Sequence, residues 1–361
     1  MIAETPAVQS LRAPGLASKQ SGRDIDPQVV AAGQQLAVFL PNYNHACYLP
    51  QALDALLVQT VQAREICVLD DASTDNSRDI IADYAARFPI IRPIYKTENR
   101  GVARNVSDWL AQSNDRYVFF AAADDVVMPD LFEQTLAMFC AYPHTGLCSA
   151  LSRLMDAEGR DLGSFVTPRP LNSPGYLAPA DAARYLMTHD SWFQGGTSIY
   201  NRAALMQAGG FRDELAGFSD GFVARAIALV HGVCFIPREL GYWRRMTSGM
   251  AAQAIGSVES ARQIADRAGK LMNGSDAAPF PPGYAARWRQ RWIFGAASAL
   301  IEGQNGAGRR KNLLALFSLS TPIERFALTV VALLPVPLIR ISLFAAMRPW
   351  DILPALRRKL F

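Results

Sequence analysis

The stretch YVFFAAADDVVMPD, residues 117–130, joins a run of apolar residues to a pair of adjacent carboxylates. An apolar run of this length is typical of a buried strand, so Asp124 and Asp125 would follow its carboxyl end. Open α/β sheets bind their ligands at that end. Two neighbouring carboxylates repel each other, and a divalent cation beside them relieves the repulsion. A surface turn followed by a helix that begins at Pro129 is the alternative.

The residues before this stretch alternate between apolar runs and amphipathic segments. Strands are predicted at 36–40, 65–69, 90–95 and 117–121, and helices at 48–59, 77–87 and 102–112. Farther along the chain, a loop is predicted at 168–179, a helix at 220–230 with Phe222, Ala226 and Leu229 on its inner face, and a last strand at 233–236. Pro93 would confine the third strand to an edge of the sheet or to an irregular position. Strand–helix alternation with short connections predicts an α/β fold, with a Rossmann-like, mainly parallel central sheet and flanking helices.

The composition is that of an ordinary globular chain. Half of the 361 residues are apolar and 19% are charged, and the net charge of +4 is too small to indicate a nucleic-acid partner. Five scattered cysteines without a C-x-x-C pair predict reduced thiols, neither a disulfide framework nor a zinc site. Together with the lack of a secretory signal pattern, this favours a cytoplasmic location.

Three further polar clusters follow predicted strands. They read PNYN at 41–44, DDASTDNS at 70–77 and ENRGVARN at 98–105. A plain turn, a helix cap or a loop would explain each cluster alone. Gathered at one edge of a sheet, they would offer an aromatic ring for a base and carboxylates for ribose hydroxyls. Arg100 and Arg104 would then be available for phosphate.

In this order, the motifs resemble the signature series of family 2 glycosyltransferases, over about residues 36–250. The resemblance implies a GT-A fold and an inverting transfer from a nucleoside diphosphate sugar, a UDP-sugar before others, with Mg²⁺ or Mn²⁺ as cofactor. The acceptor would be a hydroxyl of a glycan or lipid-linked saccharide in surface polysaccharide biosynthesis.

The resemblance also implies roles for individual residues. Those expected to contact the donor or the metal are Pro41 and Tyr43 at the nucleobase, Asp71 at the base, Asp124 near the ribose and sugar, and Asp125 at the metal. Ala123 stands at the first position of the metal motif, where an acid is frequent. The metal would therefore have fewer protein ligands.

An inverting transfer needs a carboxylate that takes the proton of the acceptor hydroxyl. The resemblance implies this role for Asp220 within GFSDGF, residues 217–222, where Ser219 replaces the first acid of the usual pair. The alternative is that Asp220 or Ser219 merely caps a helix. The dipole of that helix would keep Asp220 ionised. In a later motif, Arg244 would reach the diphosphate, while Met246 stands where a histidine is common.

An apolar run occupies residues 326–339 and is interrupted by Pro335 and Pro337. It is shorter than the roughly twenty apolar residues of a spanning helix. Because basic residues flank it, the run favours an interfacial helix with peripheral membrane contact through 322–361 at the inner face of the cytoplasmic membrane. A helix packed on the catalytic domain or on a second subunit, as in a homo-oligomer, is the alternative.

The chain is expected to divide into four regions. These are a flexible leader at 1–34, a nucleotide-sugar-binding half at 35–150, an acceptor-binding half at 151–250 and a helical C-terminal region at 251–361. Two rival functions stay open. A sugar-phosphate nucleotidyltransferase would need a glycine-rich phosphate loop, which does not follow Leu40. A non-catalytic nucleotide-sugar-binding or membrane scaffold protein would be consistent with Ser219 and Ala123.

Overall fold

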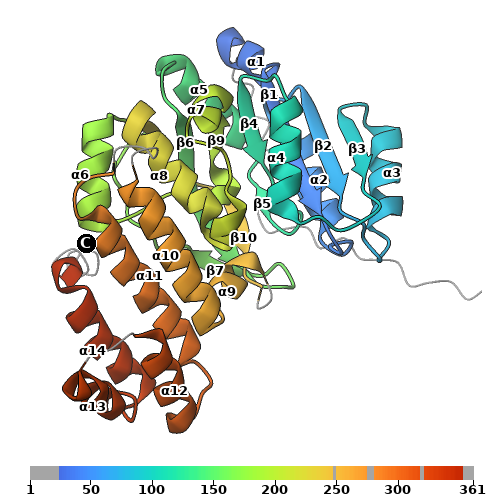
Figure 1. Cartoon of the computed structure of the whole chain (residues 1–361). Coiled ribbons are helices and arrows are strands. Elements are labelled where there is room, and N and C mark those ends of the chain that lie inside the picture. Colours follow the sequence, from blue (N-terminus) through green and yellow to red (C-terminus); the bar gives the residue numbers. More distant parts are fainter. Residues whose placement is uncertain (1–23, 247–248, 275–279, 318–320, 353–361) are drawn as a thin grey trace, which may run out of the picture.

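A mixed β-sheet lies at the centre of the structure with helices on its faces, and further helices extend away from it at one end (Figure 1). The computed structural model describes residues 24–246, 249–274, 280–317 and 321–352. The predicted leader therefore lies largely outside the described residues. The predicted class, an α/β fold with a Rossmann-like sheet and a helical C-terminal extension, is confirmed.

Ten strands form the sheet. They are β1 Leu36–Asn42, β2 Glu65–Asp70, β3 Ile91–Tyr95, β4 Tyr117–Phe120, β5 Val126–Val127, β6 Leu147–Met155, β7 Asp161–Ser164, β8 Gly175–Leu177, β9 Ile199–Asn201 and β10 Val233–Arg244. The order is β3-β2-β1-β4-β9-β6-β10-β5, with β7 beside β6 and β8 beside β10. Strands β3, β2, β1 and β4 run parallel, whereas β9 is antiparallel to both of its neighbours. As predicted from Pro93, β3 lies at an edge.

Fourteen α-helices and three short 3-10 helices lie within the described residues. The α-helices are α1 Pro27–Gly33, α2 Leu49–Leu57, α3 Ser77–Arg87, α4 Val102–Gln112, α5 Leu131–Ala141, α6 Pro179–His189, α7 Arg202–Gln207, α8 Ser219–His231, α9 Met250–Ile255, α10 Val258–Asn273, α11 Tyr284–Leu300, α12 Gly306–Leu316, α13 Pro322–Val331 and α14 Val336–Met347. The 3-10 helices are η1 Gly195–Thr197, η2 Asp213–Phe218 and η3 Pro349–Asp351.

Burial on both faces explains why the first strand is a continuous apolar run. Val38 packs into one hydrophobic cluster with α2, α3 and α5, whereas Ala37 and Phe39 pack into a second cluster with α4, α6 and α8. Parallel strands covered by helices on both faces lack the alternation of a half-exposed strand. The ring of Phe39 stacks on Trp109 of α4, with 4.9 Å between the ring centroids.

Three elements differ from the sequence prediction. Residues 27–33 form α1 inside the expected leader, because Asp26 accepts a hydrogen bond from the Gln28 amide and Pro27 fits a first helical turn. Residues 175–177 form β8 where only a loop was predicted. Finally, β10 continues to Arg244, eight residues past the predicted end at Ile236. Two register shifts in its pairing with β6 accommodate Pro237 and Gly241, residues that otherwise weaken a strand.

The C-terminal helices divide between the main body and an outer group. In α11, Trp288 stacks on Phe218 at the end of η2, with 4.5 Å between the ring centroids. Helices α12, α13 and α14 form a third hydrophobic cluster with parts of α10 and α11. Pro335 and Pro337 split the predicted apolar run, which becomes α13 and the first part of α14. Among the described helices, none has both the length and the apolar character needed to cross a membrane.

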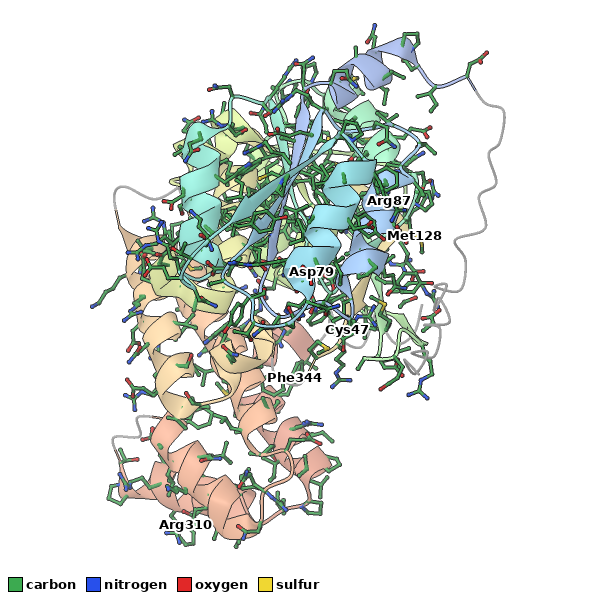
Figure 2. All side chains as sticks on the ribbon, turned by 90° about the vertical axis from the view of Figure 1, so that its right-hand side faces the viewer. Cys47, Asp79, Arg87, Met128, Arg310 and Phe344 are labelled. Carbon is green, nitrogen blue, oxygen red and sulfur yellow. The ribbon has the colours of Figure 1, made fainter. Side chains whose placement is uncertain are left out.

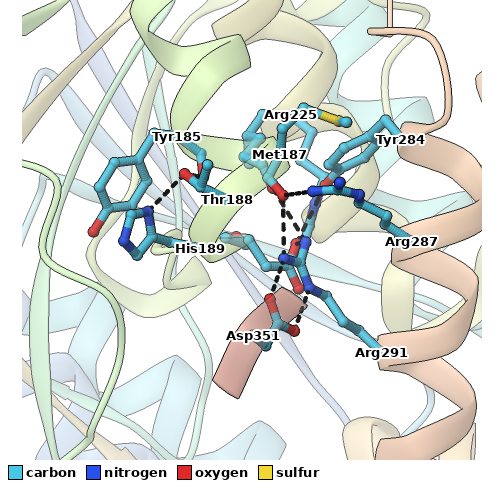
Figure 3. Close-up of polar contacts among 12 residues, drawn as sticks. Tyr185, Met187, Thr188, His189, Arg225, Tyr284, Arg287, Arg291 and Asp351 are labelled. Carbon is cyan, nitrogen blue, oxygen red and sulfur yellow. Dashed lines mark hydrogen bonds and ion pairs between the residues drawn. The ribbon is translucent and has the colours of Figure 1, made fainter. Parts of the chain in front are cut away.

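A buried ion-pair network joins the end of the described chain to the main body (Figure 3). The Asp351 carboxylate accepts from Nε and Nη2 of Arg291, at 3.0 and 2.8 Å, and from Nε of Arg348 at 2.6 Å. Arg291 also donates to the backbone oxygens of Leu186 and Met187 in α6. Burial alone would raise the pKa of Asp351, but the two guanidinium groups outweigh it and lower the pKa.

We predict that Asp351→Asn lowers the free energy of unfolding by about 3 kcal/mol, because it leaves the buried Arg291 charge without its main partner. The measurement is urea unfolding at pH 7. Asp266→Asn is the matched control, since Asp266 pairs with Arg289 at the surface and such pairs contribute about 0–1 kcal/mol. Equal losses in the two variants would contradict the prediction.

Candidate functional site

The loops after β1 and β2 are tied together at the carboxyl edge of the parallel strands. The Asn42 side chain donates to the Asp70 carboxylate and to the Ser73 hydroxyl, each at 3.2 Å. Asn44, which has a positive φ of 55°, accepts from the Thr74 amide at 2.8 Å. Figure 2 shows Cys47, in the loop after β1, at this edge of the sheet. The predicted gathering of polar clusters at one edge is therefore observed for these two loops.

The third loop is attached through Asp71. Its carboxylate is 4% exposed and accepts from the backbone amides of Arg100 at 3.0 Å and Gly101 at 2.8 Å. Gly101 has a φ of 81°, which a side chain would strain, so glycine is required at this turn. Asp71 thus holds the β3–α4 loop against β2, and its contact with a nucleobase stays a prediction.

The other donor-contact candidates lie around these loops. Tyr43 is 43% exposed directly after β1, so one ring is available for stacking. Pro41 is half-buried within β1, and Arg104 is exposed in the first turn of α4. Arg100 pairs with Asp108 at 3.0 Å, which leaves Arg104 as the guanidinium of this loop without a partner among the described residues.

Arg244, at the end of β10, holds the segment that carries Asp124 and Asp125. Its backbone amide donates to Oδ1 of Asp125, and its Nε donates to the backbone oxygen of Asp124, both at 2.8 Å. Its remaining nitrogens donate to Gln51 Oε1 and to the backbone oxygens of Asp156 and Ala157.

The guanidinium of Arg244 is enclosed by these contacts. It also lies 4.5 Å from the centroid of the Tyr48 ring, and the residue is only 2% exposed. In this arrangement Arg244 faces protein atoms on every side, so it positions the acidic pair. Its predicted contact with a diphosphate would require these bonds to break.

Two consecutive glycines in η1 separate Asp125 from Asp220. A Cβ atom on Gly196 would lie 3.2 Å from Oδ2 of Asp125, and one on Gly195 would lie 2.9 Å from Oδ2 of Asp220. Since consecutive Cα atoms are about 3.8 Å apart, the two carboxylates lie within roughly 12 Å of each other. The structure thus brings together two acids that are distant in sequence, at a turn without side chains.

Both carboxylates have raised pKa values. Burial, with a smaller contribution from the Asp124 charge, raises the pKa of Asp125 to about 8. Desolvation by the surrounding protein also raises the pKa of Asp220, although the residue is exposed at the surface. The helix dipole was expected to keep Asp220 ionised and weakly basic. The pKa shift runs opposite to the effect of a helix dipole, because desolvation outweighs the favourable amide of Gly221 and the charge of Arg225.

Neither residue at the start of α8 caps the helix in the expected way. Ser219 Oγ accepts from the Arg212 amide at 2.5 Å, and the position before the helix is Phe218, without a side-chain cap. Asp220 lies in the first turn, and its Oδ1 is bonded only to the next amide, that of Gly221. The cap alternative for Asp220 therefore has no support in the geometry.

Behind Asp220, a buried arginine fixes the first turn of α8. Arg225 donates to the backbone oxygen of Gly221 at 2.6 Å, to Tyr284 Oη at 2.8 Å and to Asp190 Oδ1 at 3.1 Å. Figure 3 shows Arg225 and Tyr284 beside Arg291, in the network that contains Asp351. The first turn of α8, which carries Asp220, is therefore held by the same buried network that attaches the C-terminal helices.

A metal at Asp125 would need most of its ligands from elsewhere. Within the described parts of the chain, no three His, Cys, Asp or Glu side chains gather closely enough to hold an ion. Mg²⁺ nevertheless binds in many enzymes through one or two carboxylates together with substrate phosphates and water. A cation would also compensate the adjacent charges of Asp124 and Asp125. The donor set thus fits a metal that is bound together with a phosphorylated ligand.

Several residues that shape the site were missed in the sequence. Gln51 and Tyr48 precede or begin α2 and carry no motif, but both contact Arg244. Arg225 lies on a helix face that was assigned to the core from its apolar neighbours. A charged residue inside an apolar helical face is the one signal that could have drawn attention to it, because such residues are rarely buried unless paired.

Part of the chain matches a known protein family. Residues 37–205 match the model described as "Glycosyl transferase family 2". An uncharacterized glycosyltransferase of Nostoc sp. is 30% identical over 174 residues, which cover 47% of this chain and 52% of that protein. The putative teichuronic acid biosynthesis glycosyltransferase TuaG of Bacillus subtilis is 31% identical over 135 residues, 36% of this chain and 52% of TuaG. The chain thus spans about half the length of these curated relatives.

Two solved structures share the fold over most of the chain. TarS 1–349 of S. aureus, in complex with UDP-GlcNAc, has a TM-score of 0.53 and 16% identity, and the match covers 82% of this chain and 90% of TarS 1–349. The mannosyltransferase PcManGT of Pyrobaculum calidifontis, in complex with GDP-Man and Mn²⁺, has a TM-score of 0.52 and 21% identity over 88% of each chain. These likenesses confirm the expected GT-A type of fold.

We predict that Asp125→Asn stabilises the metal-free protein at pH 8 but not at pH 4. When the pKa of an acid is raised in the folded state, the protein loses stability as the pH rises from the ordinary pKa of that acid to the raised pKa. The amide of the variant does not ionise, so the variant avoids this loss. Asparagine keeps an acceptor for the Arg244 amide. Thermal unfolding across this pH range is the measurement, and a variant that is less stable at pH 8 would contradict the burial argument.

Proposed function

We propose that this protein is a glycosyltransferase, which moves a sugar from a nucleoside diphosphate sugar to a hydroxyl group of a saccharide acceptor. The observation that carries the proposal is the meeting of Asp125 and Asp220 at the Gly195–Gly196 turn, beside the carboxyl edge of a Rossmann-like sheet. The family match over residues 37–205 supports it. So do the ligands named for the structural neighbours, which are UDP, UDP-GlcNAc and GDP-Man.

The donor would lie along the three tied loops. The exposed ring of Tyr43 would stack on the base beside Pro41, with Asp71 at the base edge. Arg104 would approach the phosphates, and Asp124 the ribose and sugar. The order of the loops along the edge of the sheet supports this placement of the donor. UDP-sugars are the first candidates for the donor.

Transfer would invert the configuration at C1 of the sugar. The acceptor oxygen attacks C1 while Asp220 takes its proton, and the bond between C1 and the diphosphate oxygen breaks with its electron pair on the leaving diphosphate. The raised pKa of Asp220 suits this role, because a carboxylate with a higher pKa is a stronger base.

A divalent cation would assist the departure of the diphosphate. When bound, Mg²⁺ or Mn²⁺ would neutralise the charge that develops on the leaving oxygens. Asp125 is the residue that would hold it, and the Arg244 amide orients that carboxylate. The Mn²⁺ named for PcManGT supports this choice of cofactor.

The acceptor would be a glycan or lipid-linked saccharide in surface polysaccharide biosynthesis, elongated at the inner face of the cytoplasmic membrane. Support comes from two relatives, the putative teichuronic acid biosynthesis glycosyltransferase TuaG and the chondroitin synthase of Pasteurella multocida.

We predict that Asp220→Asn binds the donor like the native protein but lowers kcat by roughly 10²–10⁴-fold, the usual contribution of a general base. The native rate should fall as pH drops through the raised pKa, since protonation removes the base, and the variant should lack this acid limb. Steady-state rates from pH 5 to 9 measure both. A variant with the native rate would refute the assignment.

Gly195→Ala is a companion variant. Its methyl group would displace the Asp220 carboxylate without disturbing the backbone, so kcat should fall while donor affinity is kept. Gly269→Ala is the control, because Gly269 lies in α10 with no atom near its Cβ position.

We further predict that one nucleotide sugar raises the unfolding temperature only when Mn²⁺ is present. The measurement is a thermal-shift screen of UDP-, GDP- and dTDP-sugars, in which ligand at 100 times Kd stabilises by about 2.7 kcal/mol. Asp125→Asn should lose the Mn²⁺-dependent part. If it keeps the full metal-dependent shift, the metal ligand is elsewhere.

A further inference from the structure

Helices α13 and α14 expose an apolar surface. Ile323 and Phe326 on α13 are 80% and 71% exposed, and Leu333 in the following turn is 70% exposed. On α14, Leu338 and Ile341 are 48% and 64% exposed. We call this set of side chains, with Val330, the outer apolar face. Six of the sixteen exposed large hydrophobic residues of the described chain lie within these nineteen positions.

The outer apolar face is not the ordinary surface of an amphipathic helix. In α13, Leu328 and Val331 pack toward the third hydrophobic cluster, so that side of the helix is already apolar. The opposite side carries Ile323, Phe326 and Val330 at the i, i+3, i+7 spacing of one stripe. No residue of α13 is buried. The apolar residues of α13 therefore extend from the side that packs on the cluster onto the exposed side, which leaves an apolar stripe in contact with water.

The charge around this face is positive. Residues 302–361 hold nine Lys or Arg and three Asp or Glu, a net +6, whereas the whole chain has +4. Arg310 and Lys311 on α12 and Arg325 on α13 are exposed, and no described residue forms an ion pair with any of them. Figure 2 shows Arg310 at the outer end of this helical group. The basic run Arg357–Lys359 follows shortly after the last described residue.

The lengths of the helices determine how they could meet a membrane. With 10 and 12 residues, α13 and α14 are about 15 and 18 Å long, half of a hydrocarbon core of about 30 Å. They could only lie in the plane of the interface, with apolar side chains inserted and basic ones at the headgroups. A protein partner would not by itself explain the excess of unpaired positive charge.

The outer group also lies on the same side of the molecule as the candidate site. In Figures 1 and 2, helices α12–α14 extend beyond the edge of the sheet at which β1 and β2 end, the edge marked by Cys47. A membrane surface in contact with the outer apolar face would therefore lie on the same side of the molecule as the loops after β1 and β2.

We propose that the outer apolar face docks onto the interfacial layer of an anionic membrane, and that docking turns the transfer site toward an acceptor anchored in the same membrane. The second half of this inference rests on the proposed function, whereas docking does not.

The test is sedimentation of the full chain with vesicles of phosphatidylglycerol and phosphatidylcholine, compared with phosphatidylcholine alone. Native protein should bind the anionic vesicles. Phe326→Glu should weaken binding about tenfold to a hundredfold, the loss expected for one inserted aromatic side chain. Val166→Glu, at a position 84% exposed in the β7–β8 loop, should bind like the native protein. Arg310→Gln and Lys311→Gln should each cost about fivefold on anionic vesicles.

Three results would overturn the docking proposal. The first is that the native chain does not bind the vesicles, and the second is that Phe326→Glu binds them as strongly as the native chain. The third is a dimer of the native chain in light scattering that Phe326→Glu dissociates, because this result assigns the outer apolar face to a second copy. Donor-dependent thermal stabilisation is measured on the same samples. If vesicles bind and no nucleotide sugar stabilises the protein, the proposed function fails and docking stands, whereas the reverse result rejects docking alone.

Discussion

The site depends on a steric constraint, which is that no side chain may stand between Asp125 and Asp220. Gly195 and Gly196 satisfy it, because a Cβ atom on either would press against one of the two carboxylates. The turn is placed by β9 and β6, which join the parallel strands β3, β2, β1 and β4 to the second half of the sheet. Two acids separated by ninety-five residues thus reach one small region, and the surrounding protein raises the pKa of both carboxyl groups.

Much of the charge near the site is used to hold it together. Asp71 fastens a loop, Arg244 orients the acidic pair, and Arg225 fixes the turn that carries Asp220. Each of these groups is buried, so its hydrogen bonds are electrostatically stronger than they would be in water. The network continues through Tyr284 and Asp190 to the C-terminal helices, which connects the mechanical attachment of that region to the helix that bears the proposed base.

The parallel half of the fold could be predicted from the sequence because its strands are short, apolar and separated by amphipathic helices. The hydrogen bonds that hold the site together could not be predicted, since a motif gives the residue type but not its bonding partner. The motif predicted that Arg244 reaches the diphosphate, but it did not reveal that its guanidinium bonds to Gln51 and to backbone oxygens. The environment of Asp220 was misjudged for a related reason, because a helix dipole can be inferred from position in the sequence, whereas desolvation depends on elements that pack from elsewhere. Strand β10 extends beyond its predicted end because bulges accommodate Pro237, and these bulges have no sequence signature.

The central claim is that one turn brings together the metal-binding and the proton-accepting carboxylates. The most direct measurement is a crystal structure of the protein with UDP and Mn²⁺. We predict a single Mn²⁺ bonded to Asp125 and to the diphosphate, on the Gly196 side of the turn. The Asp220 carboxylate should be free beside Gly195 and should point toward the space where the sugar would lie. A metal bonded to Asp220, or a diphosphate bound away from the Gly195–Gly196 turn, would contradict it.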